Sequence, residues 1–176
     1  MSGVKDFSHA FSWHRDKAGG AYAIDGNTKA AHFIGTGMSK WITTSLITLD
    51  STFFGASKFV GTGLNSWITA AVTTLRYTFN SAREMNADLS TWKVGKVTNL
   101  EDTFNGASKF AGTGLNSWIT TSLTTLQSTF WGASLVNVDF GGWDVSRVAS
   151  LQNTFRSATN YVRLFSTPLY PAHVCS

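Results

Sequence analysis

Residue types that could carry out catalysis are present in this chain, but none of them has the spacing of a known catalytic motif. The four histidines form neither a His-Glu-x-x-His motif nor a His/Cys pair of metal-ligand spacing. They are His9, His14, His32 and His173. No serine lies within Gly-x-Ser-x-Gly, the turn that exposes the nucleophile of α/β hydrolases. We therefore expect no metal site, no cofactor and no enzyme activity.

Two other patterns have a chemical and a structural interpretation. Glu101 and Asp102 are adjacent carboxylates that could act as general acid and base. They also fall at the start of an expected helix, where the helix dipole favours acids. Gly-Thr-Gly at 35–37, 61–63 and 112–114 could bind phosphate through backbone amides. These tripeptides recur with the period of the chain and lack a following Gly-Lys-Ser/Thr, which favours turns.

The overall composition excludes several classes of partner. A net charge of +4 is spread from Lys5 to Arg163, whereas nucleic-acid binding needs a clustered basic patch. The chain contains no run of eighteen apolar residues, so no membrane span is predicted. The first residues, MSGVKDFSHAF, contain no apolar segment, so no signal peptide is predicted and the localisation stays unknown. Cys175 is the one cysteine, which excludes an internal disulfide.

An internal repeat of 25 to 26 residues dominates the chain. Residues 52–69 and 103–120 differ at two of eighteen positions and lie 51 residues apart, which is two repeats. Columns of tryptophan, phenylalanine and leucine recur with this spacing. We expect these columns to form the repeat core, and they are Trp41, Trp67, Trp92, Trp118 and Trp143; Phe53, Phe79, Phe104, Phe130 and Phe155; and Leu49, Leu75, Leu100, Leu126 and Leu151.

Each repeat is expected to combine a short strand, a turn and a short helix. Apolar residues within 97–107 are spaced 3, 4 and 3, which is typical of one helix face. Residues 115–119 are rich in strand-forming types. Such a unit buries its apolar side only by stacking on its neighbours, with the strands paired in parallel. The predicted fold is a short right-handed α/β solenoid of the leucine-rich-repeat type, with five to six repeats and a parallel sheet.

The repeats also predict the organisation of the chain. A partial repeat at 1–12 is followed by an inserted loop at 13–28 and by full repeats at 29–160. Insertions in repeat proteins map to loops, often on a binding face. Residues 161–176 contain both prolines and are expected to form a C-terminal cap or docking tail.

Residues 89–110, LSTWKVGKVTNLEDTFNGASKF, and 140–158, FGGWDVSRVASLQNTFRSA, resemble the 26-residue bacterial surface repeat of the BspA-like leucine-rich-repeat class. The resemblance covers about residues 30–160 and implies an adhesion or protein-interaction scaffold at a cell surface, with no catalytic residues. The near-identical copies depart from the pattern, because they read GTGLNSWITTS where the family has an acidic strand end.

We therefore predict a non-enzymatic module that acts as an adhesion or scaffold protein, or as an accessory subunit of a larger assembly or filament. Its partner would be a protein or another copy of the chain. A carbohydrate-binding protein is the alternative, and an ice-binding protein with a column of Thr43, Thr69 and Thr120 is a weaker one. Aromatic residues outside the repeat columns are the candidate interface, since exposed aromatic side chains often mark binding sites. They are Trp13, Tyr22, Phe54, Trp131, Tyr161 and Tyr170.

Overall fold

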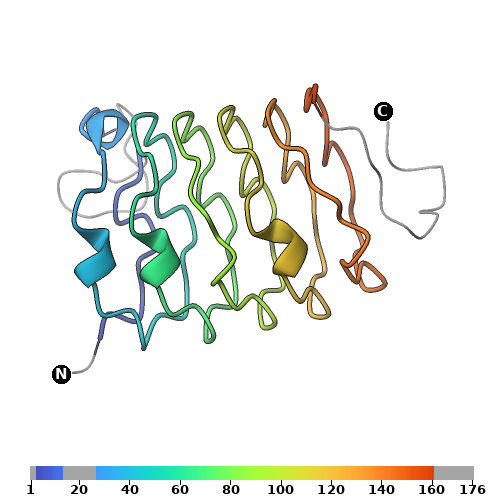
Figure 1. The fold of residues 1–176 in the computed structure, drawn as a ribbon, viewed down its shortest axis with the longest axis horizontal. Coiled ribbons are helices and arrows are strands. Elements are labelled where there is room, and N and C mark those ends of the chain that lie inside the picture. Colours follow the sequence, from blue (N-terminus) through green and yellow to red (C-terminus); the bar gives the residue numbers. More distant parts are fainter. Residues whose placement is uncertain (1–2, 14–26, 161–176) are drawn as a thin grey trace.

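The chain winds into successive coils that lie side by side, as a computed structural model shows for residues 3–13 and 27–160 (Figure 1). Five isolated parallel β-bridges connect equivalent residues of neighbouring coils, and we name each coil by its bridge residue. The six bridge residues in order are Asp6, Thr48, Thr74, Asn99, Thr125 and Ser150. Residues 3–13 contribute only the second half of a coil, and the coils follow one another in sequence order along the long axis.

The apolar stripe at 97–107 forms consecutive turns and not a helix. The amide of Thr103 donates to Leu100 O at 3.1 Å, but the amide of Asp102 donates to Gln127 O in the next coil at 3.0 Å. Amides along the segment alternate in this way between a local carbonyl and a neighbouring coil. An α-helix needs every amide to bond four residues back. Asp102, with φ of 53°, also interrupts any helical path.

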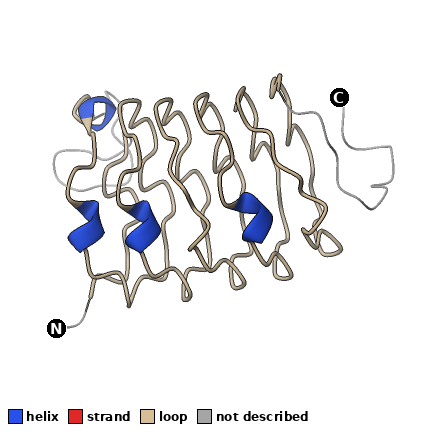
Figure 2. Ribbon diagram, viewed as in Figure 1, coloured by secondary structure: helices blue, strands red, loops and turns tan. Residues whose placement is uncertain are grey.

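No strand or sheet is present in the described residues. One residue of each coil forms a β-bridge to the next coil, and a turn begins two residues after it. The expected strand at 115–119 is replaced in its first half by a 3-10 helix. The predicted right-handed α/β solenoid of the leucine-rich-repeat type, with a parallel sheet, is therefore wrong. The molecule is a stack of turn-rich coils (Figure 2).

Four 3-10 helices of three residues each are the only helices in residues 3–13 and 27–160: η1 (Ala30–His32), η2 (Met38–Lys40), η3 (Leu64–Ser66) and η4 (Leu115–Ser117). η3 and η4 belong to the two near-identical sequence copies. A left-handed glycine precedes η2, η3 and η4, so the second glycine of each Gly-Thr-Gly sequence sets the start of a helix. The turn interpretation of these tripeptides is confirmed, since both glycines in each have positive φ.

A continuous column of phenylalanine rings passes through the centre of the stack. Neighbouring rings in the series Phe53, Phe79, Phe104 and Phe130 stack with centroids 5.6 Å apart. The residues of the columns predicted as core are buried, with three exceptions. Trp41, Leu151 and Phe155 are half-buried. Contact between equivalent rings explains why the columns keep one residue type, because a smaller side chain would leave a void.

Buried polar groups connect each coil to its neighbour. The indole nitrogen of Trp92 donates to Leu64 O at 2.9 Å, and Trp67, Trp118 and Trp143 bond the preceding coil in the same way. The buried hydroxyl of Thr103 lies 2.8 Å from Leu100 O and 2.9 Å from Leu75 O. These bonds give the buried indole and hydroxyl donors a partner, and they hold adjacent coils in register.

Candidate interaction face

A row of side chains projects from the stack at the position that follows each core tryptophan. The tryptophan points inward, the next residue outward, the residue after that inward again, and the fourth outward. This alternation follows from the extended backbone, which begins at Trp67 (ψ 137°) and at Trp118 (ψ 131°). We define the isoleucine face as the two outward rows, which are Ile42, Ile68, Lys93, Ile119 and Asp144, and Thr44, Ala70, Gly95, Thr121 and Ser146.

Three isoleucines on this face are largely exposed to solvent. The exposed fractions of Ile42, Ile68 and Ile119 are 60%, 51% and 66%. Single exposed aliphatic residues are ordinary in proteins, but Ile42 and Ile68 stand at equivalent positions of neighbouring coils, and Ile119 follows beyond Lys93. Exposed apolar side chains grouped on one face often mark binding sites. Ile68 and Ile119 come from the two near-identical copies, so duplication of the sequence placed the same side chain twice on one face.

Buried threonines beneath the row fix its backbone. The hydroxyl of Thr43 accepts a hydrogen bond from the amide of Ile68 at 2.8 Å, and that of Thr69 accepts one from the amide of Lys93, also at 2.8 Å. Thr120 donates to Asp144 O of the Ser150 coil at 3.1 Å, whereas Val94 offers no hydroxyl to the Thr125 coil. Each isoleucine of the row is therefore followed by a buried threonine whose hydroxyl bonds the backbone of the next coil.

These bonds also bear on the ice-binding alternative. Thr43, Thr69 and Thr120 are only 2–3% exposed. An ice-binding array needs hydroxyls at the surface, so this threonine column cannot contact ice.

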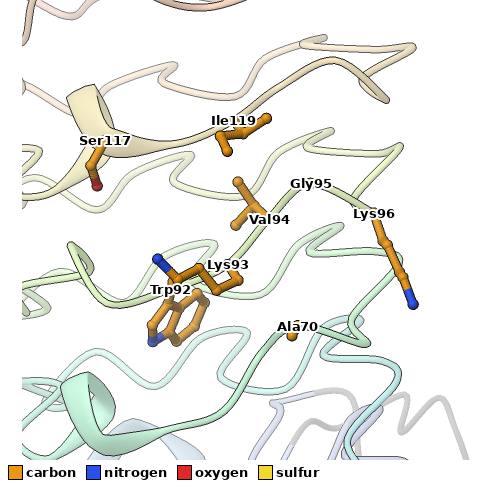
Figure 3. Close-up of a pocket in the computed structure, with 8 residues that line it drawn as sticks. All are labelled: Ala70, Trp92, Lys93, Val94, Gly95, Lys96, Ser117 and Ile119. Carbon is orange, nitrogen blue, oxygen red and sulfur yellow. The ribbon is translucent and has the colours of Figure 1, made fainter.

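A hollow of about 210 Å³ lies on this face in the Asn99 coil (Figure 3). Its floor and walls come from three coils: Ala70 from the Thr74 coil, residues 92–96 from the Asn99 coil, and Ser117 and Ile119 from the Thr125 coil. The hollow exists because Ala70 and Gly95 are the smallest side chains in an outward row that carries threonine or serine in the other coils.

Two lysines border the hollow. In Figure 3 the Lys93 and Lys96 side chains extend to opposite sides of Val94 and Gly95. The ion pairs of the described chain join Arg76 to Asp50 and Lys109 to Glu84, so neither lysine forms an ion pair within residues 3–13 and 27–160. The hollow thus combines an apolar floor with positive charge on two sides.

A cluster of polar side chains lies in the turns on another side of the stack. Arg76 Nε lies 3.0 Å from Asp50 Oδ2, and Tyr77 Oη donates to Glu101 Oε1 at 3.3 Å. Burial raises the pKa of Tyr77 to about 12, with the nearby carboxylates of Asp102 and Glu101 adding to the shift. The ion pair and the hydrogen bond each connect turns of neighbouring coils. Glu101 and Asp102 do not cap a helix, as no helix begins there.

The aromatic residues proposed as an interface do not form one patch. Trp13, Phe54 and Trp131 are half-buried, and Phe54 and Trp131 occupy equivalent turn positions, but two asparagine-bearing coils separate them. Trp13 is equivalent to Gly55, since its amide bonds Phe54 O as the Gly55 amide bonds Asn80 O. The guanidinium of Arg156 lies over the Trp131 ring at 4.9 Å from its centroid, and Phe54 meets Tyr77 edge to face. Tyr22, Tyr161 and Tyr170, most of the inserted loop and the whole C-terminal tail lie outside the described residues.

The isoleucine face was not predicted from the sequence. A signal was available, since Ile42, Ile68 and Ile119 each follow a column tryptophan. A strand has two faces, and the sequence does not show which of them is solvated. The isoleucine column could therefore not be distinguished from the core columns.

Within residues 3–13 and 27–160, no group of three or more His, Cys, Asp or Glu side chains is arranged to hold a metal ion. No helix in the same residues is long and apolar enough to cross a membrane.

Comparison with known proteins gives one family. No curated protein sequence and no solved structure matches this chain. A family profile described as "Mycoplasma protein of unknown function, DUF285" matches residues 25–113 and again residues 91–167, which together span more than half of the chain. This match fits a repeat protein of the surface type, but it does not extend to the BspA-like leucine-rich-repeat class. The chain therefore belongs to the DUF285 family.

Proposed function

We propose that this chain is a non-enzymatic interaction module that binds a partner protein through the isoleucine face. The observation that carries the proposal is the row of Ile42, Ile68 and Ile119, each more than half exposed and each followed by a buried threonine whose hydroxyl bonds the next coil. Burying such side chains against a partner is favourable, and the fixed backbone lowers the entropy lost on binding.

Three exposed carboxylates support a non-enzymatic role because their local bonds are structural. Asp88, Asp139 and Asp144 each accept a hydrogen bond from the backbone amide two residues later, as in Asx-turns. Hydrogen bonds from Ser146 hold the pKa of Asp144 below its ordinary value. A carboxylate that is bonded in a turn and has a lowered pKa, as Asp144 has, suits turn formation and not proton transfer.

A selection of phage-displayed random peptides on the immobilised full chain tests this proposal. We expect the selected peptides to bind the Ile68→Ser/Ile119→Ser variant about tenfold or more weakly, since each lost aliphatic contact is worth about 1–2 kcal/mol. The variant should keep its stability, because exposed positions contribute little to folding.

Ile34→Ser is the matched control. Ile34 is 54% exposed but belongs to the other extended segment of its coil, so this change should leave binding of the selected peptides unaltered. Peptides that bind the wild type and the double variant equally well, or a selection that yields no specific peptides, would contradict the proposal.

A further inference from the structure

The hollow in the Asn99 coil has a shape and charge that restrict what can occupy it. Ala70, Val94 and Gly95 give its central part a floor without charged groups, and Ile119 adds an exposed apolar wall. A charged group placed on this floor would lose water without gaining a partner. The centre of the hollow therefore suits an aliphatic side chain.

The surroundings of the hollow suit negative charge. Lys93 and Lys96 leave the same coil on opposite sides of the hollow, and neither is paired with a carboxylate of residues 3–13 or 27–160 (Figure 3). Exposed Arg147, two coils away, lies at the position equivalent to Lys96, and exposed Lys40 directly precedes Trp41. One carboxylate, Asp144, shares the outward rows, and its Oδ1 already accepts hydrogen bonds from the amide and hydroxyl of Ser146. A ligand with acids on both sides of an apolar group would match this pattern.

The apolar residues around the hollow favour a peptide over a polysaccharide. Sugar rings are bound mainly by stacking on exposed aromatic faces. The exposed apolar side chains here are Ile42, Ile68 and Ile119, and the ring of Trp92 at the hollow is 2% exposed. Isoleucine offers a contact surface for aliphatic side chains and none of the flat platform that a sugar ring needs.

Resting on the proposed function, we infer that the hollow receives an aliphatic side chain from an extended segment of the partner protein, with acidic residues on both sides of it that meet Lys93 and Lys96. The segment runs along the stack and contacts Ile68 and Ile119 on either side of the Asn99 coil. This arrangement specifies the partner as an acidic, aliphatic peptide region.

The test compares peptide selections on three full-length proteins. Peptides selected on the wild type should be enriched in Asp and Glu around a central aliphatic residue, and their affinity should fall with added salt. They should bind Lys93→Glu/Lys96→Glu about tenfold or more weakly. Peptides selected on that variant should instead carry Lys and Arg around the aliphatic residue.

Lys58→Glu/Arg83→Glu is the matched charge control, because it changes the net charge equally at exposed positions away from the hollow. Equal loss of binding in both charge variants would show a general charge effect and overturn the inference. Peptides that depend on Ile68 and Ile119 but lack acidic residues would overturn it while leaving the proposed function intact.

A third outcome concerns polysaccharides and uses heparin as the probe. Heparin binding that depends on Lys93 and Lys96, in the absence of any selected peptide, would assign the face to an anionic polysaccharide and overturn both proposals.

Discussion

At the scale of single residues, buried polar atoms form hydrogen bonds that tie one coil to the next. The Trp92 indole and the Thr103 hydroxyl each bond a carbonyl of the preceding coil. The charged form of Asp102 is less favourable in the folded protein, because its carboxylate is partly buried in a turn. Burial raises the pKa of Asp102, the charge of Glu101 raises it further, and hydrogen bonds from Asn105 and Tyr77 oppose the shift.

Asp102→Asn is expected to stabilise the protein at pH 7. Because the folded-state pKa is raised above the unfolded value of about 3.9, the charged carboxylate costs stability at all pH values above the folded pKa. Below the unfolded pKa the side chain is protonated in both states, so the gain should disappear there. Asparagine also tolerates the positive φ at this position. Thermal unfolding of both proteins at pH 7 and pH 3 measures this difference.

A larger gain from Asp102→Asn at pH 3 than at pH 7 would show that the carboxylate stabilises the turn instead. Asp139→Asn is a suitable control, since Asp139 is exposed and accepts a local amide bond from Gly141.

At the scale of elements, short turns and 3-10 helices replace the expected helices and strands. Residues with positive φ recur at equivalent positions in every coil, among them Ser51, Tyr77, Asp102 and Ser128. Such residues end any growing helix, and the amides that they release bond the adjacent coil. Local spacing of apolar residues therefore reports which side of the chain is buried without reporting the backbone conformation.

Gly114→Ala is expected to destabilise the protein by about 2 kcal/mol or more, or to prevent folding. Gly114 has φ of 93°, which costs about 1–2 kcal/mol for a residue with a Cβ. An added Cβ would also lie 2.6 Å from the carbonyl carbon of Leu89 and overlap the backbone of Ser90. Urea unfolding of the full chain measures the loss.

Gly142→Ala provides the comparison, because a Cβ there would meet no atom within 4 Å. It should change the free energy of unfolding by less than about 0.5 kcal/mol. Equal effects of the two substitutions would show that the left-handed turn before η4 is not needed.

At the scale of the whole molecule, each coil contacts mainly its two neighbours. Backbone bonds such as Leu75 N to Asn99 O and Leu100 N to Thr125 O join adjacent coils through equivalent positions. Stability in such a stack is approximately a sum over coils and the contacts between them. The molecule can therefore gain or lose whole coils without a change in the remaining ones.

Deletion of residues 52–102 should leave a shorter folded stack. The new junction joins Ser51 to Thr103, which is equivalent to the native Ser51–Thr52 junction. We expect a lower free energy of unfolding and a smaller dependence on urea, since less surface is buried. The deletion also removes Lys93 and Lys96, so peptides selected on the full chain should no longer bind. Loss of cooperative urea unfolding, followed by tryptophan fluorescence, would contradict the additive behaviour.

The sequence alone determined the repeat period, the apolar columns and the glycine turns. These features depend on residue type and spacing, which are visible in one chain. Gly112 and Gly114, for example, adopt the positive φ that their repeated Gly-Thr-Gly pattern indicates. The columns are visible for the same reason, since every coil must present a matching side chain to the next.

The tertiary structure decided the backbone conformation and the exposed face. The amide of Asp102 could bond within its own segment or to Gln127 in the next coil, and only the stacked arrangement selects the second partner. Likewise, the stack buries Trp118 and leaves the adjacent Ile119 in solvent, although both residues are apolar. Hydrogen-bond partners and exposure both depend on neighbouring coils, and the local sequence carries no record of where those neighbours lie.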